Sequence, residues 1–118
     1  MEINLVQGDD SKVYKFQRKS VVNNEVIKTS PQKIWITFKY APENKNFLFQ
    51  KTLGNGITYN ENDFYYRFQI KKEDTEKLYV GRYGFDIAIL NEAGEKKTLL
   101  NNGILNILDH YTKKENEV

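Results

Sequence analysis

A chain of 118 residues with 39% hydrophobic and 14% aromatic side chains is large and apolar enough to fold around one core, which excludes general disorder. Its 18 lysines and arginines stand against 16 aspartates and glutamates, a formal net charge of +2. These charges are interspersed, which argues against the clustered cations of a nucleic-acid-binding protein, so we expect no nucleic acid partner.

Cysteine is absent, so neither disulfides nor thiolate metal ligands support the fold, as is usual for a protein matured in a reducing cytoplasm. We expect no secretion signal, because Met1–Asn4 has neither a basic start nor an apolar core. No apolar run approaches the ~20 residues that span a bilayer, so we expect no membrane partner.

Short runs of alternating apolar and polar residues recur along the chain and predict half-buried strands. The predicted strands, in chain order, are Met1–Val6, Lys12–Lys19, a weak run at Val26–Ile27, Ile34–Tyr40, Phe47–Thr52, Ile57–Tyr59, Tyr65–Lys71, Tyr79–Leu90, Lys96–Leu100 and Gly103–Leu108. The strictest alternation is in Gly81–Leu90, where Tyr83, Phe85, Ile87 and Ile89 share one face. About eight or nine short strands in one chain are typical of a β-sandwich.

Turn residues separate these runs and fix the domain organisation. The predicted turns are Gly8-Asp9-Asp10, Asn23-Asn24, Gly54-Asn55-Gly56, Asn60–Asp63, Asn91–Gly94 and Asn101-Asn102. The charged segment Lys72–Lys77 lacks glycine and proline and predicts one short helical turn near 72–78. We therefore predict an all-β, immunoglobulin-like β-sandwich domain over residues 1–109 and a polar C-terminal tail over 110–118.

Residues with catalytic or metal-binding chemistry are sparse. Asp9 and Asp10 could offer oxygen ligands to a calcium ion, but they lack the regular spacing of a calcium loop, so we interpret them as turn residues that accept hydrogen bonds from local amides. His110 is the only histidine and has no second histidine or cysteine with which to bind zinc. We predict no metal, no cofactor and no enzymatic activity.

Several aromatic residues, among them Trp35 and Tyr65, fall outside the face that alternation assigns to the core. Such residues fill the core from strand ends, contact another subunit, or stack on sugar rings, and the sequence leaves all three open. Tyr83 begins a late strand, where a tyrosine hydroxyl can pin a corner of the fold, so we interpret it as structural.

The order of these elements resembles the small immunoglobulin-like structural proteins of tailed phages and prophages of Gram-positive bacteria, including the N-terminal domains of baseplate upper proteins. The resemblance covers roughly residues 1–109 and depends on turn glycines and hydrophobic alternation. The segments that carry it are Gln7-Gly8-Asp9, Ile34–Lys39, Phe64–Phe68, Glu73-Asp74-Thr75 and Gly81–Ile87.

This resemblance implies a non-enzymatic virion protein, made in the host bacterial cytoplasm and located in the virion. A single domain suits a baseplate or tail accessory, a connector or a capsid-surface decoration. Its partners would be other virion proteins in a symmetric multicopy assembly, with a homo-oligomer also open. We predict contacts through sheet edges and terminal segments, with Ile104, Ile107, Trp35 and Tyr65 as partner-binding residues.

Three other functions stay open. A carbohydrate-binding β-sandwich would use Trp35 and exposed tyrosines as a stacking platform for a surface glycan. A small phage-encoded inhibitor of a host defence would have the same size and compactness. A small enzyme would need a nucleophile with an activating base, and the sequence displays no such motif.

Overall fold

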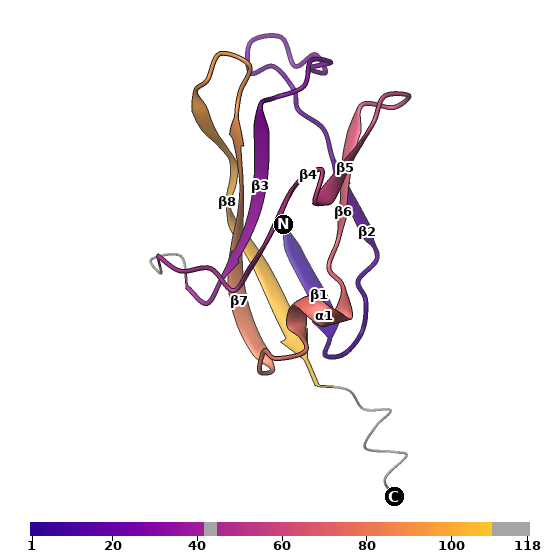
Figure 1. Cartoon of the computed structure of the whole chain (residues 1–118), viewed down its shortest axis with the longest axis vertical. Coiled ribbons are helices and arrows are strands. Elements are labelled where there is room, and N and C mark those ends of the chain that lie inside the picture. Colours follow the sequence, from indigo (N-terminus) through magenta and orange to yellow (C-terminus); the bar gives the residue numbers. More distant parts are fainter. Residues whose placement is uncertain (42–44, 110–118) are drawn as a thin grey trace, which may run out of the picture.

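The computed structural model describes residues 1–41 and 45–109, which form strands apart from one short helix (Figure 1). The elements are β1 (Glu2–Val6), β2 (Val13–Phe16), β3 (Lys33–Lys39), β4 (Phe49–Leu53), β5 (Gly56–Asn60), β6 (Tyr65–Gln69), α1 (Lys72–Thr75), β7 (Gly81–Leu90) and β8 (Lys96–Leu108). The predicted all-β class is therefore confirmed, and the helical turn expected near 72–78 is α1. The tail predicted over 110–118, with His110, lies outside the described residues.

The strands of the described part of the chain form one mixed sheet in the order β1-β8-β7-β3-β4-β5-β6-β2. Most neighbours are antiparallel, whereas β1 runs parallel to β8 and β4 touches β5 in parallel only at Thr52–Gly56 and Leu53–Ile57. A tight connection at Gly54, with φ of 88°, turns the chain there. Since so few residues join β4 to β5, the sheet can bend sharply at this point.

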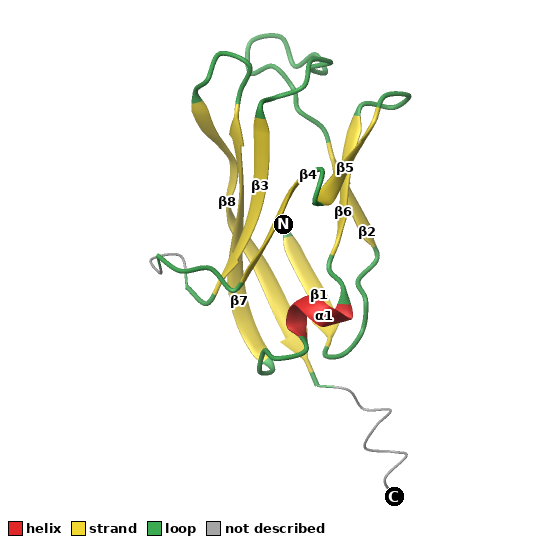
Figure 2. Ribbon diagram, viewed as in Figure 1, coloured by secondary structure: helices red, strands yellow, loops and turns green. Residues whose placement is uncertain are grey.

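The curled sheet has two layers that face each other (Figure 2). One layer holds β1, β8, β7, β3 and β4, and the other holds β5, β6 and β2 (Figure 1). The edge strands are β1 and β2, the two ends of the strand order. Residues 104–108 of β8 lie between β1 and β7, so this terminal segment is not a sheet edge.

The core lies between the layers and comes from the inward positions of the alternating strands. Its fully buried side chains include Ile3, Ile34, Ile36, Phe38, Ile57, Tyr66, Ile70, Leu105 and Ile107. Phe38 stacks on Phe49 and on Phe85, with ring centroids 4.3 and 5.1 Å apart. Phe85 in turn covers Gly103, where a Cβ atom would lie 2.6 Å from the ring, so only glycine fits beneath it.

The last strand departs most from the sequence prediction. Asn101-Asn102 was expected to be a turn between two strands, but β8 runs unbroken from Lys96 to Leu108. The pairing shifts from Phe85–Gly103 to Ile87–Leu100, so Asp86 alone faces both asparagines. The two asparagines are therefore accommodated as a β-bulge, which bends a strand without ending it.

Hydrogen bonds from side chains secure the end of the molecule near α1. The Tyr83 hydroxyl donates to the backbone oxygen of Tyr79 at 2.7 Å, which confirms that this tyrosine pins a corner. Asp10 accepts a hydrogen bond from the backbone amide of Lys72 at 2.8 Å. This partner is 62 residues away in the sequence, so the bond differs from the local amide contact that was predicted for Asp10.

A buried arginine forms hydrogen bonds at the end of the molecule opposite α1. Arg18, whose side chain is 5% exposed, donates to Glu92 at 2.9 Å and to the backbone oxygen of Thr29 at 3.1 Å. Thr29 also donates to Glu92. These bonds tie the connection between β2 and β3 to the turn between β7 and β8, and the sequence analysis did not identify this role of Arg18.

Candidate functional site

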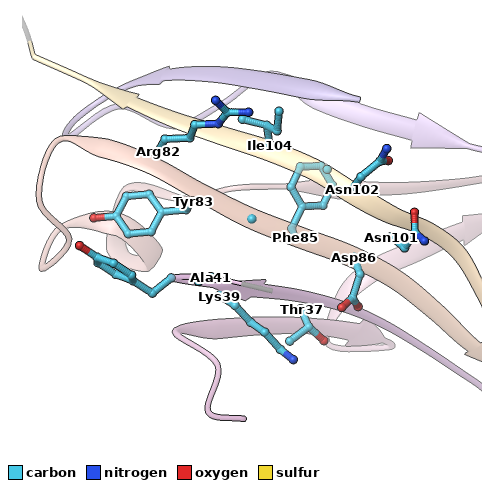
Figure 3. Close-up of a pocket in the computed structure, with 13 residues that line it drawn as sticks. Thr37, Lys39, Ala41, Arg82, Tyr83, Phe85, Asp86, Asn101, Asn102 and Ile104 are labelled. Carbon is cyan, nitrogen blue, oxygen red and sulfur yellow. The ribbon is translucent and has the colours of Figure 1, made fainter. Parts of the chain in front are cut away.

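A concave surface lies on the outer face of the layer that contains β3, β7 and β8 (Figure 3). It consists of two hollows that share Thr37, Lys39 and Asp86, with volumes of about 500 and 340 Å³. We call the two together the outer groove. Figure 3 shows the larger hollow, with Arg82 and Ile104 side by side and Thr37 and Asp86 apart from them.

Strand alternation explains which residues reach this groove. Ile34, Ile36 and Phe38 point into the core, so Trp35, Thr37 and Lys39 point outward from β3. By the same rule, Gly84, Asp86 and Ala88 are the outward positions of β7.

Register explains where the larger hollow lies. Gly84 pairs with Lys39 on one side and with Ile104 on the other. Lys39, Gly84 and Ile104 are therefore neighbouring outward positions on three strands, and the middle one has no side chain. The backbone at Gly84 forms the floor of the hollow. The bulge brings Asn101 and Asn102 opposite Asp86 at the rim of the same hollow.

Cations predominate among the charged residues that line the groove. Lys39 and Arg82 line the larger hollow, Lys45 and Lys96 line the smaller one, and Asp86 is the carboxylate common to both. Within residues 1–41 and 45–109, none of these five side chains belongs to an ion pair. The groove therefore attracts anions and hydrogen-bond acceptors.

Apolar and aromatic side chains form the remaining walls. Tyr40 is 66% exposed and meets Tyr83 edge-on, with ring centroids 5.7 Å apart, beside the larger hollow. The smaller hollow is lined by Trp35, the only tryptophan of the chain, and by Phe47, which is 52% exposed. Exposed rings beside unpaired polar groups are common in binding surfaces.

The opposite layer presents a different outer face. Asp63 accepts two hydrogen bonds from Arg67, and the two residues form an ion pair at 2.5 Å. The Arg67 guanidinium, aided by the Tyr65 backbone amide, lowers the pKa of Asp63 to about 2. Lys15 lies over the Tyr65 ring at 4.5 Å from its centroid, and Arg67 lies 5.9 Å from the same centroid. Charged groups on this face therefore already have partners.

The structure distributes the four predicted partner-binding residues over three environments. Ile104 and Trp35 come together at the outer groove, one in each hollow. Tyr65 lies on the opposite outer face, so it cannot form one stacking platform with Trp35. Ile107 is 1% exposed and belongs to the core, which leaves its side chain no surface to offer a partner.

Several groove residues escaped the sequence analysis. Alternation along Gly81–Leu90 leaves Gly84 and Asp86 on the face opposite Tyr83 and Phe85, and pairing this strand with Ile34–Tyr40 would have brought them beside Lys39. The asparagines at 101 and 102 were missed because they were interpreted as a turn. Among the described residues, no group of three or more His, Cys, Asp or Glu side chains could hold a metal ion.

No family model matches the chain, and a search of curated proteins finds no match. Over the residues that the structure describes, no helix is long and apolar enough to cross a membrane.

Proposed function

We propose that the chain is an immunoglobulin-like β-sandwich that serves as a non-enzymatic structural component of a tailed-phage virion, as a baseplate or tail accessory, a connector or a capsid-surface decoration. It acts through contacts with other virion proteins, in a symmetric assembly of many copies. The resemblance of residues 1–109 to such phage proteins is the source of the proposal.

The strand pairing supports the immunoglobulin-like assignment. Variable-type immunoglobulin domains place strands B, E and D in one layer and strands C, C′, F and G in the other. Here β2 pairs with β6 and β6 with β5, while β3 pairs with β4 and β7, and β7 with β8. The Tyr83 hydroxyl, near the start of β7, donates to the backbone oxygen of Tyr79, and this bond resembles the tyrosine corner near the start of strand F in such domains, which supports the assignment.

The observation that carries the contact function is the unpaired charge of the outer groove. Its lysines, arginine and aspartate have no ion-pair partners in the described chain, whereas Asp63 and Arg67 on the opposite face neutralise each other. On a surface whose charged groups have no internal partner, an external partner can form ion pairs without breaking existing ones.

Mass spectrometry of purified particles tests this function. We expect the chain at a fixed ratio to the major capsid protein: hundreds of copies for a decoration, a few to dozens for a baseplate or neck. Ile104→Asp should release it from particles, because the substitution puts a carboxylate into the groove, whereas Tyr65→Ala on the opposite face should leave it attached. Absence of the wild-type chain from intact particles would reject the proposal.

A second function, carbohydrate binding, is favoured by one observation: Trp35 lines a hollow together with the polar groups of Gln50 and Asp86. Sugar-binding sites pair an aromatic ring with amide and carboxylate groups that bind hydroxyls. Saturable binding on a glycan array that Trp35→Ala abolishes and Tyr65→Ala preserves would support this function. Equal glycan binding by both variants would show that Trp35 takes no part in carbohydrate binding.

A further inference from the structure

The two hollows of the outer groove differ in the ligand groups that they suit. Tyr40, Ala41 and Ile104 line the larger hollow, whose floor is the backbone at Gly84. Such a surface offers few hydrogen-bonding side chains at its centre, so it suits an apolar side chain better than a hydroxyl-covered sugar ring. The smaller hollow has Trp35 and Phe47 beside more polar groups.

Cations frame this apolar hollow and extend beyond it. Lys39 and Arg82 lie at the larger hollow, and Lys45 and Lys96 lie at the smaller one. Four like charges around one surface repel one another, and carboxylates placed among them would relieve this repulsion. The complementary ligand therefore carries several negative charges next to an apolar group.

We propose that the outer groove binds an acidic polypeptide segment that inserts one apolar side chain between Tyr40 and Ile104 and directs its carboxylates to the surrounding cations. The proposal rests on the proposed contact function of this groove and specifies the chemistry of the partner. Asp86 lies among these cations and selects a segment that also offers a backbone or side-chain N–H at that point.

The test is a titration of the ¹⁵N-labelled full chain with a short synthetic peptide of aspartate, glutamate and glycine around one central leucine. We expect amide shifts concentrated in β3, β7 and β8, a change in the fluorescence of Trp35, and an affinity that falls as salt rises. Replacing the peptide's leucine by serine should weaken binding about fivefold or more, because the apolar anchor is lost.

Variants of the chain separate the groove from general charge attraction. Lys39→Glu with Arg82→Glu should weaken binding of the acidic peptide about tenfold or more. Lys19→Glu, an exposed lysine outside the groove, should change it less than about twofold. The neutral pair Lys39→Gln with Arg82→Gln should give an intermediate loss, and the dispersion of the amide spectrum verifies that each variant is folded.

Three outcomes of the peptide titrations would overturn the proposal: no amide shifts in the groove, equal binding of a peptide in which lysines replace the acidic residues, or a loss of peptide affinity in Lys19→Glu as large as in the double variant. A fourth is Trp35-dependent binding of polygalacturonate that is tighter than binding of the peptide, which would assign the groove to an anionic glycan. The proposed function is tested separately by particle composition. A chain present in particles that fails to bind the peptide rejects only this inference, and peptide binding by a chain absent from particles rejects only the virion function.

Discussion

The two outer faces of the curled sheet use their charged residues differently. On the face of β6 and β2, Asp63 pairs with Arg67, and both Arg67 and Lys15 lie against Tyr65. On the face of β3, β7 and β8, Lys39 and Arg82 border a hollow without ion-pair partners in the described chain. Exposed charges that form ion pairs within the chain interact with each other, whereas unpaired charges around a concavity are available for ion pairs with another molecule.

Both faces lie over the same hydrophobic core, and the largest expected effect is the loss of stability when a core side chain is truncated. Phe38 is fully buried between Phe49 and Phe85 beneath the groove, so Phe38→Ala should lower the free energy of unfolding by about 3–5 kcal/mol. Phe16→Ala, in the other layer, removes a half-buried ring and should cost less. Urea denaturation of both variants measures the difference, and an equal or larger loss for Phe16→Ala would contradict it.

A smaller effect is expected at the corner that precedes β7. Tyr83→Phe removes the hydroxyl that donates to the Tyr79 backbone oxygen but keeps the buried ring, so the free energy of unfolding should fall by about 1 kcal/mol. The same urea titration measures it, with Tyr79→Phe as the control because only the backbone of Tyr79 takes part in the bond. A variant as stable as the wild type would show that this hydroxyl contributes nothing to the corner.

A single substitution can remove the ion pair between Asp63 and Arg67 on the face of β6 and β2. Arg67→Gln should raise the pKa of Asp63 from about 2 toward the ordinary value of 3.8, because the guanidinium that favours the carboxylate is lost. The lowered pKa stabilises the fold above about pH 3.8, and this contribution disappears as the pH falls toward about 2. Carboxyl NMR titration measures the shift, and an unchanged pKa would assign the effect to the Tyr65 amide alone.

The smallest effect is expected on the groove face. Lys39→Gln with Arg82→Gln removes two cations that have no internal partners, so stability should stay unchanged or rise slightly as repulsion is relieved. Thermal denaturation at low and high salt measures this. A clear loss of stability would mean that these side chains support the fold, and the contrast between the two faces would disappear.

Strand alternation predicted most of the fold because it depends only on which residues are buried. The strand Gly81–Leu90 and the helical turn after residue 71 are where the sequence placed them. Asn101-Asn102 was misinterpreted because asparagine pairs favour turns and bulges alike, and only the pairing with Asp86 distinguishes the two.

The candidate site was predicted less completely because it depends on which strands are neighbours. Ile104 and Trp35 were identified, but their shared groove follows from the order β8-β7-β3, which alternation does not reveal. Ile107 was identified by its position near the end of the chain, yet it is one register position away from the outward face. A shift of one residue is enough to exchange surface and core.

The parallel pairing of β1 with β8 has a mechanical consequence. Register pairs run from Glu2–Ile104 to Val6–Leu108, so the first and last strands lie side by side and point the same way. Tension applied between the start of β1 and the end of β8 would slide one strand along the other and load the hydrogen bonds of this ladder together. A ladder pulled in shear resists far greater force than one opened bond by bond, which would suit a domain that transmits load along its own length.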